Sequence, residues 1–542
     1  MSSQSIAAAP IAPSVVARPW RHRLACAMTA LLMGLAQGLG LQLVSANLSS
    51  IQGSIGATAA EASWLTTAYF ATALSSTLLL AKFRVQFGIR RFASLGAWAC
   101  LAAAALHIAT TSLGSAVVAR AAFGFASAPL SALAVLYMLE VFPPRLAAFG
   151  LILGFATLQL GQPLARIISP DLLEHGQWHG LFLFEVALAA LSLAAIHAVR
   201  LTPIPRVQTF SRGDLVAFPL YAGGLALLSI VVSQGRVAWW FDAPWIGECL
   251  AASIACLAAY AVVDLSRERP LLDLRWLARP SMIRFVVAVL LFRIVLSEQT
   301  IGIVGLMTGL GQSNEQMEQM FAFAALGTVV GFGVSIVMLA LNAGRLLSLL
   351  STALIGLAAW HDADATALTR PDDLLVTQTL IAGGLSAYFS AACLHGFGPV
   401  MADGAKQLIT FVAAFSGAQY LGSLLGSAWI ATLAAQRQQW HYAALVQHLV
   451  TSDPQVATRI AQLSGSVAAV VNDPAARSLQ GASLLAQQVS RESLVLAYED
   501  VFTAIAWVCL GMFAWLAFLA TRAWLQERAI GAVNAARSAA TH

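Results

Sequence analysis

Long apolar stretches follow one another along nearly the whole chain, from Leu24 almost to Arg522, with short polar gaps between them. An α-helix needs about 20 apolar residues to cross the hydrocarbon core of a bilayer, which is roughly 30 Å thick. Only 10% of the 542 residues are charged, whereas soluble domains carry roughly 25%. The sequence therefore predicts an all-α polytopic membrane protein.

The apolar stretches predict fourteen transmembrane helices, at residues 24–47, 62–82, 92–110, 114–138, 147–168, 179–199, 214–234, 244–264, 282–308, 319–341, 344–360, 374–395, 406–434 and 499–522. Twenty Lys and Arg residues lie in the termini and the even-numbered gaps, against three in the short odd-numbered gaps. Basic residues concentrate in cytoplasmic loops, so both termini are expected in the cytoplasm. This topology also explains the net charge of +5 without nucleic acid.

One gap differs from the others. Residues 436–498 are polar and contain four arginines and a helical apolar spacing at 443–449. Long translocated loops are exempt from the charge bias, so these arginines agree with a position outside the cytoplasm. The segment is either a docking surface for a periplasmic partner or a solvated helical cap.

Within the predicted spans, glycines are spaced four apart at Gly327 and Gly331 and at Gly422 and Gly426. Small residues at this spacing let helix backbones approach closely. The six cysteines stand singly, without metal-ligand spacing, and are expected to be buried. No metal, no cofactor and no enzymatic activity are predicted, and no P-loop for ATP is present.

Several motifs resemble those of the major facilitator superfamily. The gap between spans two and three reads LLAKFRVQFGIRRF, a Gly and basic cluster like the superfamily's cytoplasmic gating loop, with Gly88, Arg90 and Arg91. Span four reads VVARAAFGFASAP, which is similar to its Arg-x-x-x-Gly motif with Arg120. The usual acidic residue of the gating loop is missing. Span five reads LGFATLQLGQPLAR, which is similar to the antiporter motif of exporters, except that the usual glycine pair is replaced near Ala165 and Arg166.

The segment from Ala46 to Lys82 and the end of the chain, from span thirteen through the long gap to span fourteen, resemble the EmrB and QacA-like drug:proton antiporters, and EmrB-type pumps most closely. The resemblance implies a bundle of six helices at 24–199, an inserted helix pair at 214–264 and a second bundle at 282–522, between cytoplasmic tails 1–23 and 523–542. It also implies a periplasmic adaptor and an outer-membrane channel as partners. EmrB-type proteins usually carry an aspartate in span one, where this chain has no carboxylate.

Ionisable residues inside spans are costly and therefore mark functional sites. Glu298 lies deepest and is predicted to carry protons, because a carboxyl group kept out of water takes up a proton more readily. Glu185 is the second candidate. Arg120 and Arg293 are predicted cavity residues, and a structural ion pair of either with Glu298 is the alternative.

Aromatic residues could line an apolar drug pocket, although Trp and Tyr are also usual at membrane interfaces. The pocket candidates are Tyr69, Phe123 and Phe155. His107, which stands near a span end, is expected to have an interfacial or capping role.

These features predict proton-coupled efflux of small amphipathic organic compounds or drugs across a bacterial inner membrane, by two bundles that rock about a midplane site. Transport of a single metabolite or siderophore is the alternative within this class. A non-transporting membrane sensor is an alternative from another class, favoured by the missing carboxylate of span one.

Overall fold

The computed structural model describes residues 19–143, 146–202, 206, 208–267, 270–403, 407–450 and 452–540, so residues 1–18 of the predicted N-terminal tail lie outside it. Regular secondary structure in the described residues is helical, without strands. The helices are α1 (Trp20–Ala46), α2 (Leu48–Ile55), α3 (Ala59–Phe87), α4 (Ile89–Ile108), α5 (Leu113–Val141), α6 (Ala147–Gln159), α7 (Gly161–Ala198), α8 (Asp214–Gly235), α9 (Pro244–Leu265), α10 (Leu274–Leu277), α11 (Pro280–Ser297), the π-helix η2 (Glu298–Gly302), α12 (Ile303–Gly309), α13 (Glu318–Ala340), α14 (Gly344–Asp362), the 3₁₀-helix η3 (Pro371–Leu374), α15 (Leu375–Asp403), α16 (Leu408–Gln447), α17 (Pro454–Ser466) and α18 (Pro474–Ala540).

Twelve helical segments of the described chain are long and apolar enough to cross a membrane. They confirm the polytopic all-α class. The helices α14 and α16, which coincide with predicted spans eleven and thirteen, are not among the twelve. The total of fourteen spans therefore stays a prediction.

Helices α1, α3, α4, α5 and α7 share one apolar core, to which α8, α9 and α16 also contribute side chains. Helix α3 begins at Thr58, whose hydroxyl accepts from the Glu61 backbone N–H at 3.2 Å while the Glu61 carboxylate accepts from the Thr58 backbone N–H at 2.8 Å. This reciprocal cap satisfies backbone donors that the helix cannot satisfy itself. Gly88 alone separates α3 from α4 and has φ +87°, a conformation that favours glycine.

Helix α8, which packs against α9, is held along α3 by hydrogen bonds. Gln234 of α8 donates to Thr67 at 2.7 Å and to Ser63 at 3.0 Å. Ser75 donates to the carbonyl of Ala222 at 3.0 Å. In an apolar environment unpaired polar groups are costly, so these bonds specify where α8 docks.

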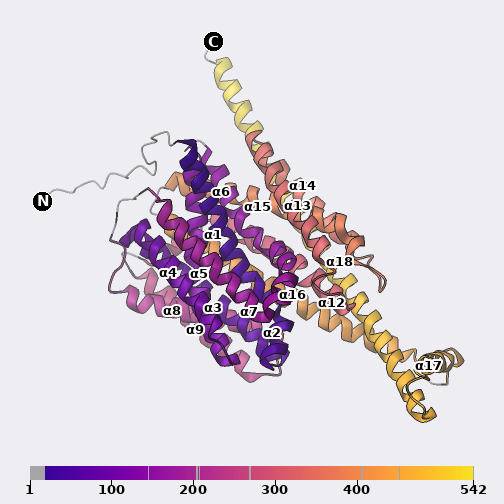
Figure 1. The fold of residues 1–542 in the computed structure, drawn as a ribbon. Coiled ribbons are helices and arrows are strands. Elements are labelled where there is room, and N and C mark those ends of the chain that lie inside the picture. Colours follow the sequence, from indigo (N-terminus) through magenta and orange to yellow (C-terminus); the bar gives the residue numbers. More distant parts are fainter. Residues whose placement is uncertain are drawn as a thin grey trace.

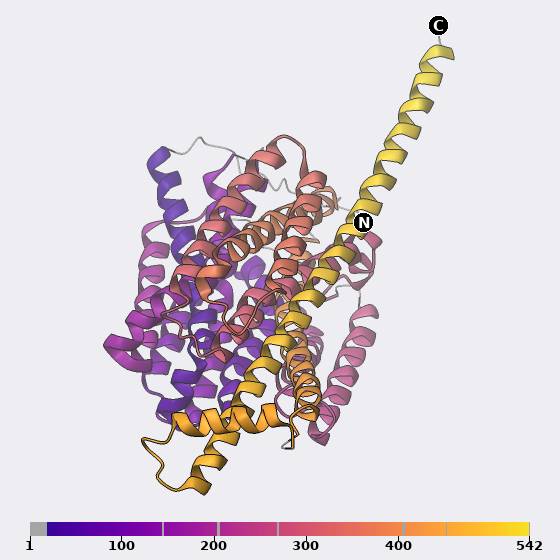
Figure 2. The same cartoon turned by 90° about the vertical axis from the view of Figure 1, so that its right-hand side faces the viewer.

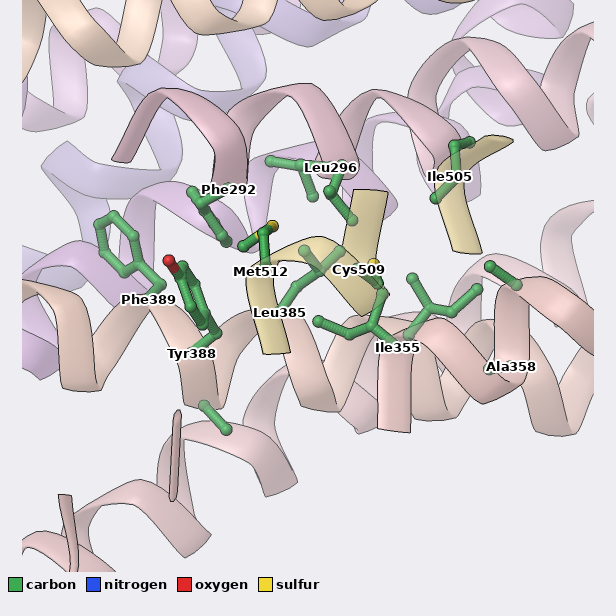
Figure 3. Close-up of a cluster of buried hydrophobic side chains, with 14 of the residues drawn as sticks. Phe292, Leu296, Ile355, Ala358, Leu385, Tyr388, Phe389, Ile505, Cys509 and Met512 are labelled. Carbon is green, nitrogen blue, oxygen red and sulfur yellow. The ribbon is translucent and has the colours of Figure 1, made fainter. Parts of the chain in front are cut away.

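The helices from α11 onward form a second core. Figure 3 shows Phe292 and Leu296 of α11 beside residues of α14, α15 and α18, which include Ile355, Leu385 and Cys509. Backbone contact is close where glycines were predicted to allow it, because a Cβ on Gly327 or Gly331 would collide with carbonyl groups of α15. Equivalent collisions at Gly422 and Gly426 would involve α11.

The two groups of helices, α1–α7 and α11–α18, meet along a surface that we call the seam. Helix α3 contacts α16 there, and α6 and α7 contact α13. Figure 1 shows the early, indigo to magenta helices and the later, orange helices side by side. The division into two six-helix bundles with an inserted pair stays a prediction.

Two predicted spans differ in detail from the structure. Predicted span five is broken after α6 at Leu160, and the next helix, α7, runs on through the expected gap before span six. Predicted span fourteen is the middle of α18, a helix of 67 residues. Figures 1 and 2 show α18 projecting beyond the bundle at both ends, with α17 beside its first turns. No proline follows Pro474 within α18, so no residue there lacks the backbone N–H that an uninterrupted helix needs.

Candidate functional site

Glu298 opens a turn of π-helix in the middle of predicted span nine. Such wide turns are frequent at functional sites because they redirect side chains out of the regular α-helical register. Glu298 is fully buried, and its Oε1 accepts a hydrogen bond from Gln378 Nε2 of α15 at 3.0 Å. It forms no salt bridge with Arg293 or Arg120, so neither alternative ion pair is present among the described residues.

The same Gln378 amide nitrogen donates to a second buried carboxylate. Asp362, the last residue of α14, accepts with Oδ2 at 2.9 Å and is 1% exposed. Gln299 in turn donates to the Gln378 backbone carbonyl at 3.0 Å. The other carboxylate oxygens, Glu298 Oε2 and Asp362 Oδ1, have no hydrogen-bond partner in the structure.

This cluster, Glu298–Gln378–Asp362, is chemically unusual. Two carboxylates share one neutral amide, and neither has a salt-bridge partner among the described residues. Negative charges repel strongly where water is excluded, and a buried ion without a counter-ion is costly. A proton shared by the pair relieves both costs, so the arrangement suits a site that takes up and releases protons.

A second buried cluster lies among α1, α4, α5 and α7. The Nη1 atom of Arg120 lies 3.8 Å from Glu185 Oε1 and donates to the carbonyl of Gly40 at 3.1 Å. His107 Nδ1 lies 3.5 Å from Glu185 Oε2 and is fully buried, so the expectation that His107 is interfacial was wrong. The guanidinium of Arg120 also stacks on Tyr69, at 4.8 Å from the ring centre.

The three aromatic residues that were predicted to line a drug pocket lie in two different parts of the structure. Tyr69 and Phe123 are almost completely buried around Arg120, inside the first group of helices. Phe155 lies on the seam instead, where its ring meets Phe389 at 5.5 Å and Phe415 at 4.8 Å between centroids. Of the three, Phe155 is therefore the one placed at the contact between the two groups.

Arg293 also lies on the seam and is partly buried. Its Nε donates to the backbone carbonyl of Gln419 at 3.2 Å, and its Nη1 reaches Gln159 Oε1 of α6 at 3.4 Å. Gln159 and Gln299 help to line a cavity of about 10 Å³ between α6, α7, α11, α13 and α15. This volume holds at most one water, so the structure is closed at this point.

A polar latch joins the two groups near the end of α1. Arg166 donates to Asn314 Oδ1 at 2.7 Å and to the Ala46 carbonyl at 3.3 Å. Asn314 Nδ2 donates to the same carbonyl at 3.1 Å and to Asn47 Oδ1 at 3.3 Å. The arginine that replaces the exporter motif's small residues therefore bridges the seam.

The predicted gating loop finds its acidic partner elsewhere in the chain. Lys82, just before the loop, forms a buried ion pair with Asp214 of α8 at 2.9 Å, and Arg267 binds the other oxygen of Asp214 at 2.5 Å. Arg90 donates to the Leu201 carbonyl at 3.3 Å, and both Arg90 and Arg91 are exposed. Helix α8 thus supplies a carboxylate that the loop itself lacks.

Four of the cysteines are buried and two are partly exposed. Potential metal ligands do gather once in the described residues: His22, Cys26 and Glu140 place one ligand atom each within 4.8 Å of one another. This group could not be found from residue spacing, because Glu140 lies far from His22 and Cys26 along the chain. The Cys26 sulfur lies 3.5 Å from His22 Nε2, a separation that a hydrogen bond explains.

The chain was compared with known proteins. No family model matches it. It is 24% identical over 254 residues to the fatty acid resistance protein FarB of Neisseria gonorrhoeae, a match that covers 46% of this chain and 50% of FarB. It is 21% identical over 238 residues to the multidrug export protein EmrB of Haemophilus influenzae, which covers 44% of this chain and 46% of EmrB. The chain thus spans about half the length of the curated relatives it matches.

Solved structures extend the likeness to nearly the whole chain. The human organic anion transporter MFSD10 has a TM-score of 0.53 at 14% identity, covering 91% of this chain and all of that one. A bacterial homologue of the human drug peptide transporters PepT1 and PepT2 has a TM-score of 0.52 at 14% identity, covering 93% and 99%. The major facilitator symporter XylE scores 0.50 at 13% identity, covering 90% and 94%. The chain therefore has the major facilitator fold, and its sequence is similar to EmrB-type export proteins.

Proposed function

We propose that this chain is a proton-coupled exporter of amphipathic organic compounds in a bacterial inner membrane. Its relatives are export and resistance proteins and its structural neighbours are transporters. The observation that carries the proposal further is the Glu298–Gln378–Asp362 cluster. Proton antiport needs a buried group that changes its protonation state when the contact between the two groups of helices changes. A pair of buried carboxylates that can take up and release a proton meets this requirement.

The cluster is placed to sense the seam. Gln299, the residue after Glu298, lines the small cavity and also bonds to Gln378. When the seam opens, water and substrate reach Gln299 first, and its movement disturbs the amide that both carboxylates share. Release of the proton held by the two carboxylates is thereby linked to opening of the seam. The π-helix gives this stretch a local geometry that can rearrange.

Glu185 has a different part in this proposal. Its carboxylate lies 3.8 Å from Arg120 Nη1 in the first group of helices, so the guanidinium compensates its charge. A compensated carboxylate has less need of a proton. We therefore assign proton coupling to Glu298 with Asp362 as its partner, and a positioning role to the Arg120–Glu185 pair.

The topology and partners follow the sequence argument. Basic residues place both termini in the cytoplasm, which puts the cap of α17 and the adjoining ends of α16 and α18 in the periplasm. In that position the cap, predicted at 436–498, would receive a periplasmic adaptor that leads to an outer-membrane channel. The names of the fatty acid resistance and multidrug export relatives make lipophilic compounds the first substrates to try.

Accumulation of lipophilic dyes in inside-out vesicles under an imposed proton gradient tests the proposal. The wild type should accumulate dye, and Glu298→Gln should lose gradient-driven accumulation while it still equilibrates dye down a concentration gradient. Glu318→Gln is the matched control, because Glu318 is exposed at the start of α13. Normal accumulation by Glu298→Gln would remove Glu298 from the mechanism.

The alternatives make different predictions in the same vesicles. A transporter of one metabolite or siderophore would move none of the dyes but would move its own substrate with the gradient. A membrane sensor would move nothing under any condition. The latch and the closed cavity favour transport over sensing, because both lie on the surface that must open for a substrate to pass.

A further inference from the structure

Arginines lie at the seam, whereas the buried carboxylates lie inside the two groups of helices. Two groups of side-chain hydrogen bonds cross between α1–α7 and α11–α18 in the described residues, and they are centred on Arg166 and Arg293. The buried carboxylates lie behind the seam: Glu185 with Arg120 in one group of helices, and Glu298 and Asp362 with Gln378 in the other. A substrate at the seam therefore meets positive rather than negative side chains.

Arg293 has unused binding capacity. A guanidinium carries five N–H donors, and Arg293 uses two of them, one toward a backbone carbonyl and one in a long bond to an amide oxygen. No carboxylate forms an ion pair with Arg293 in the described part of the chain. Its fork geometry matches a carboxylate. The bond to Gln159 crosses the seam, so opening the seam frees one further donor.

An aromatic cluster lies one helical turn from both partners of Arg293. Phe155 precedes Gln159 by four residues on α6, and Phe415 precedes Gln419 by four residues on α16. Together with Phe292 and Phe389 these phenylalanines form contiguous ring contacts. One turn of helix rises about 5.4 Å. Arg293 and the phenylalanine cluster therefore lie close enough to bind the charged group and the apolar part of one molecule.

We propose that Arg293 is the head-group subsite for amphipathic carboxylate anions, whose apolar part is received by the cluster of Phe155, Phe292, Phe389 and Phe415. In the closed structure Arg293 donates hydrogen bonds to Gln159 Oε1 and to the Gln419 carbonyl. A substrate carboxylate replaces the Gln159 oxygen when α6 moves away from α11. This inference rests on the proposed function for its transport role, and it adds the sign of the substrate's charge.

Three probes with one apolar part test this selectivity: 1-pyrenebutyrate, 1-pyrenebutanol and 1-pyrenebutylamine. Their binding to the purified full chain and their transport in proteoliposomes are followed by fluorescence. The wild type should bind the butyrate about tenfold or more tightly than the other two, as charge-assisted hydrogen bonds imply. Arg293→Gln should lose that preference and leave amine binding unchanged, and Arg293→Lys should retain part of it.

Arg284→Gln is the control variant, because Arg284 lies on the same helix but is exposed and bonds to its own backbone turn. Preference for the amine by the wild type, or an equal loss of all three probes in Arg293→Gln, would overturn the subsite. Selective butyrate binding without gradient-driven transport would instead leave the subsite standing and contradict the proposed export. Proton-driven transport without any preference for the anion would contradict the subsite alone.

Discussion

Replacing Gln378 by leucine removes the donor that two buried carboxylates share. Leucine has a similar size, so the main loss is the pair of hydrogen bonds at 3.0 and 2.9 Å. A bond to an ionised carboxylate contributes about 1.5–3 kcal/mol and one to a protonated carboxyl about 0.5–1.5 kcal/mol. The expected loss in free energy of unfolding is therefore about 2–4.5 kcal/mol, toward the lower end because unfolded helices in lipid find other partners.

Unfolding by SDS titration of the bicelle-reconstituted chain measures this loss. Adding Glu298→Gln to Gln378→Leu should recover about 1 kcal/mol or more, because a neutral amide at 298 needs the missing donor less than a carboxylate does. The loss should also grow from pH 5 to pH 8, since ionisation of the orphaned carboxylates becomes more favourable in water as pH rises. An unchanged stability of Gln378→Leu, or no recovery in the double variant, would refute the shared-amide account.

Three further perturbations test other contacts. Asn314→Ala should weaken the latch with Arg166, so a cysteine introduced at 46, where only the backbone carbonyl takes part in the latch, should react faster with a membrane-impermeant maleimide. Asp214→Asn should leave Lys82 without its counter-ion and lower the melting temperature by several degrees, since breaking a buried pair is costly. Gly88→Ala should lower stability by about 1–2 kcal/mol, because φ +87° is unfavourable for any residue with a Cβ; the same SDS titration measures it.

The fold could be predicted because hydropathy and loop charge act over long windows. The same reasoning found Glu298, Glu185, Arg120 and Arg293, since a charged residue inside an apolar stretch is visible by itself. It could not find their partners. Which carboxylate faces which amide depends on the rotation of packed helices, and an uncharged Gln378 gives no signal.

Other misses have equally local causes. Asp362 lies just beyond the predicted end of span eleven, so a search for charged residues inside spans did not include this buried carboxylate. His107 looked interfacial at a span end, yet Phe182 stacks on it at 4.6 Å between ring centroids. The hydropathy pattern around Glu298 does not distinguish a turn of π-helix from a regular α-helix.

Proton movement caused by substrate tests the central claim most directly. A pH-sensitive dye trapped in proteoliposomes reports protons as a lipophilic substrate is added outside, for the wild type and for Glu298→Gln. Wild-type protein should move protons opposite to the substrate, and Glu298→Gln should move substrate down its gradient without moving protons. Equal proton movement by both proteins, or substrate movement by the wild type without protons, would contradict this claim.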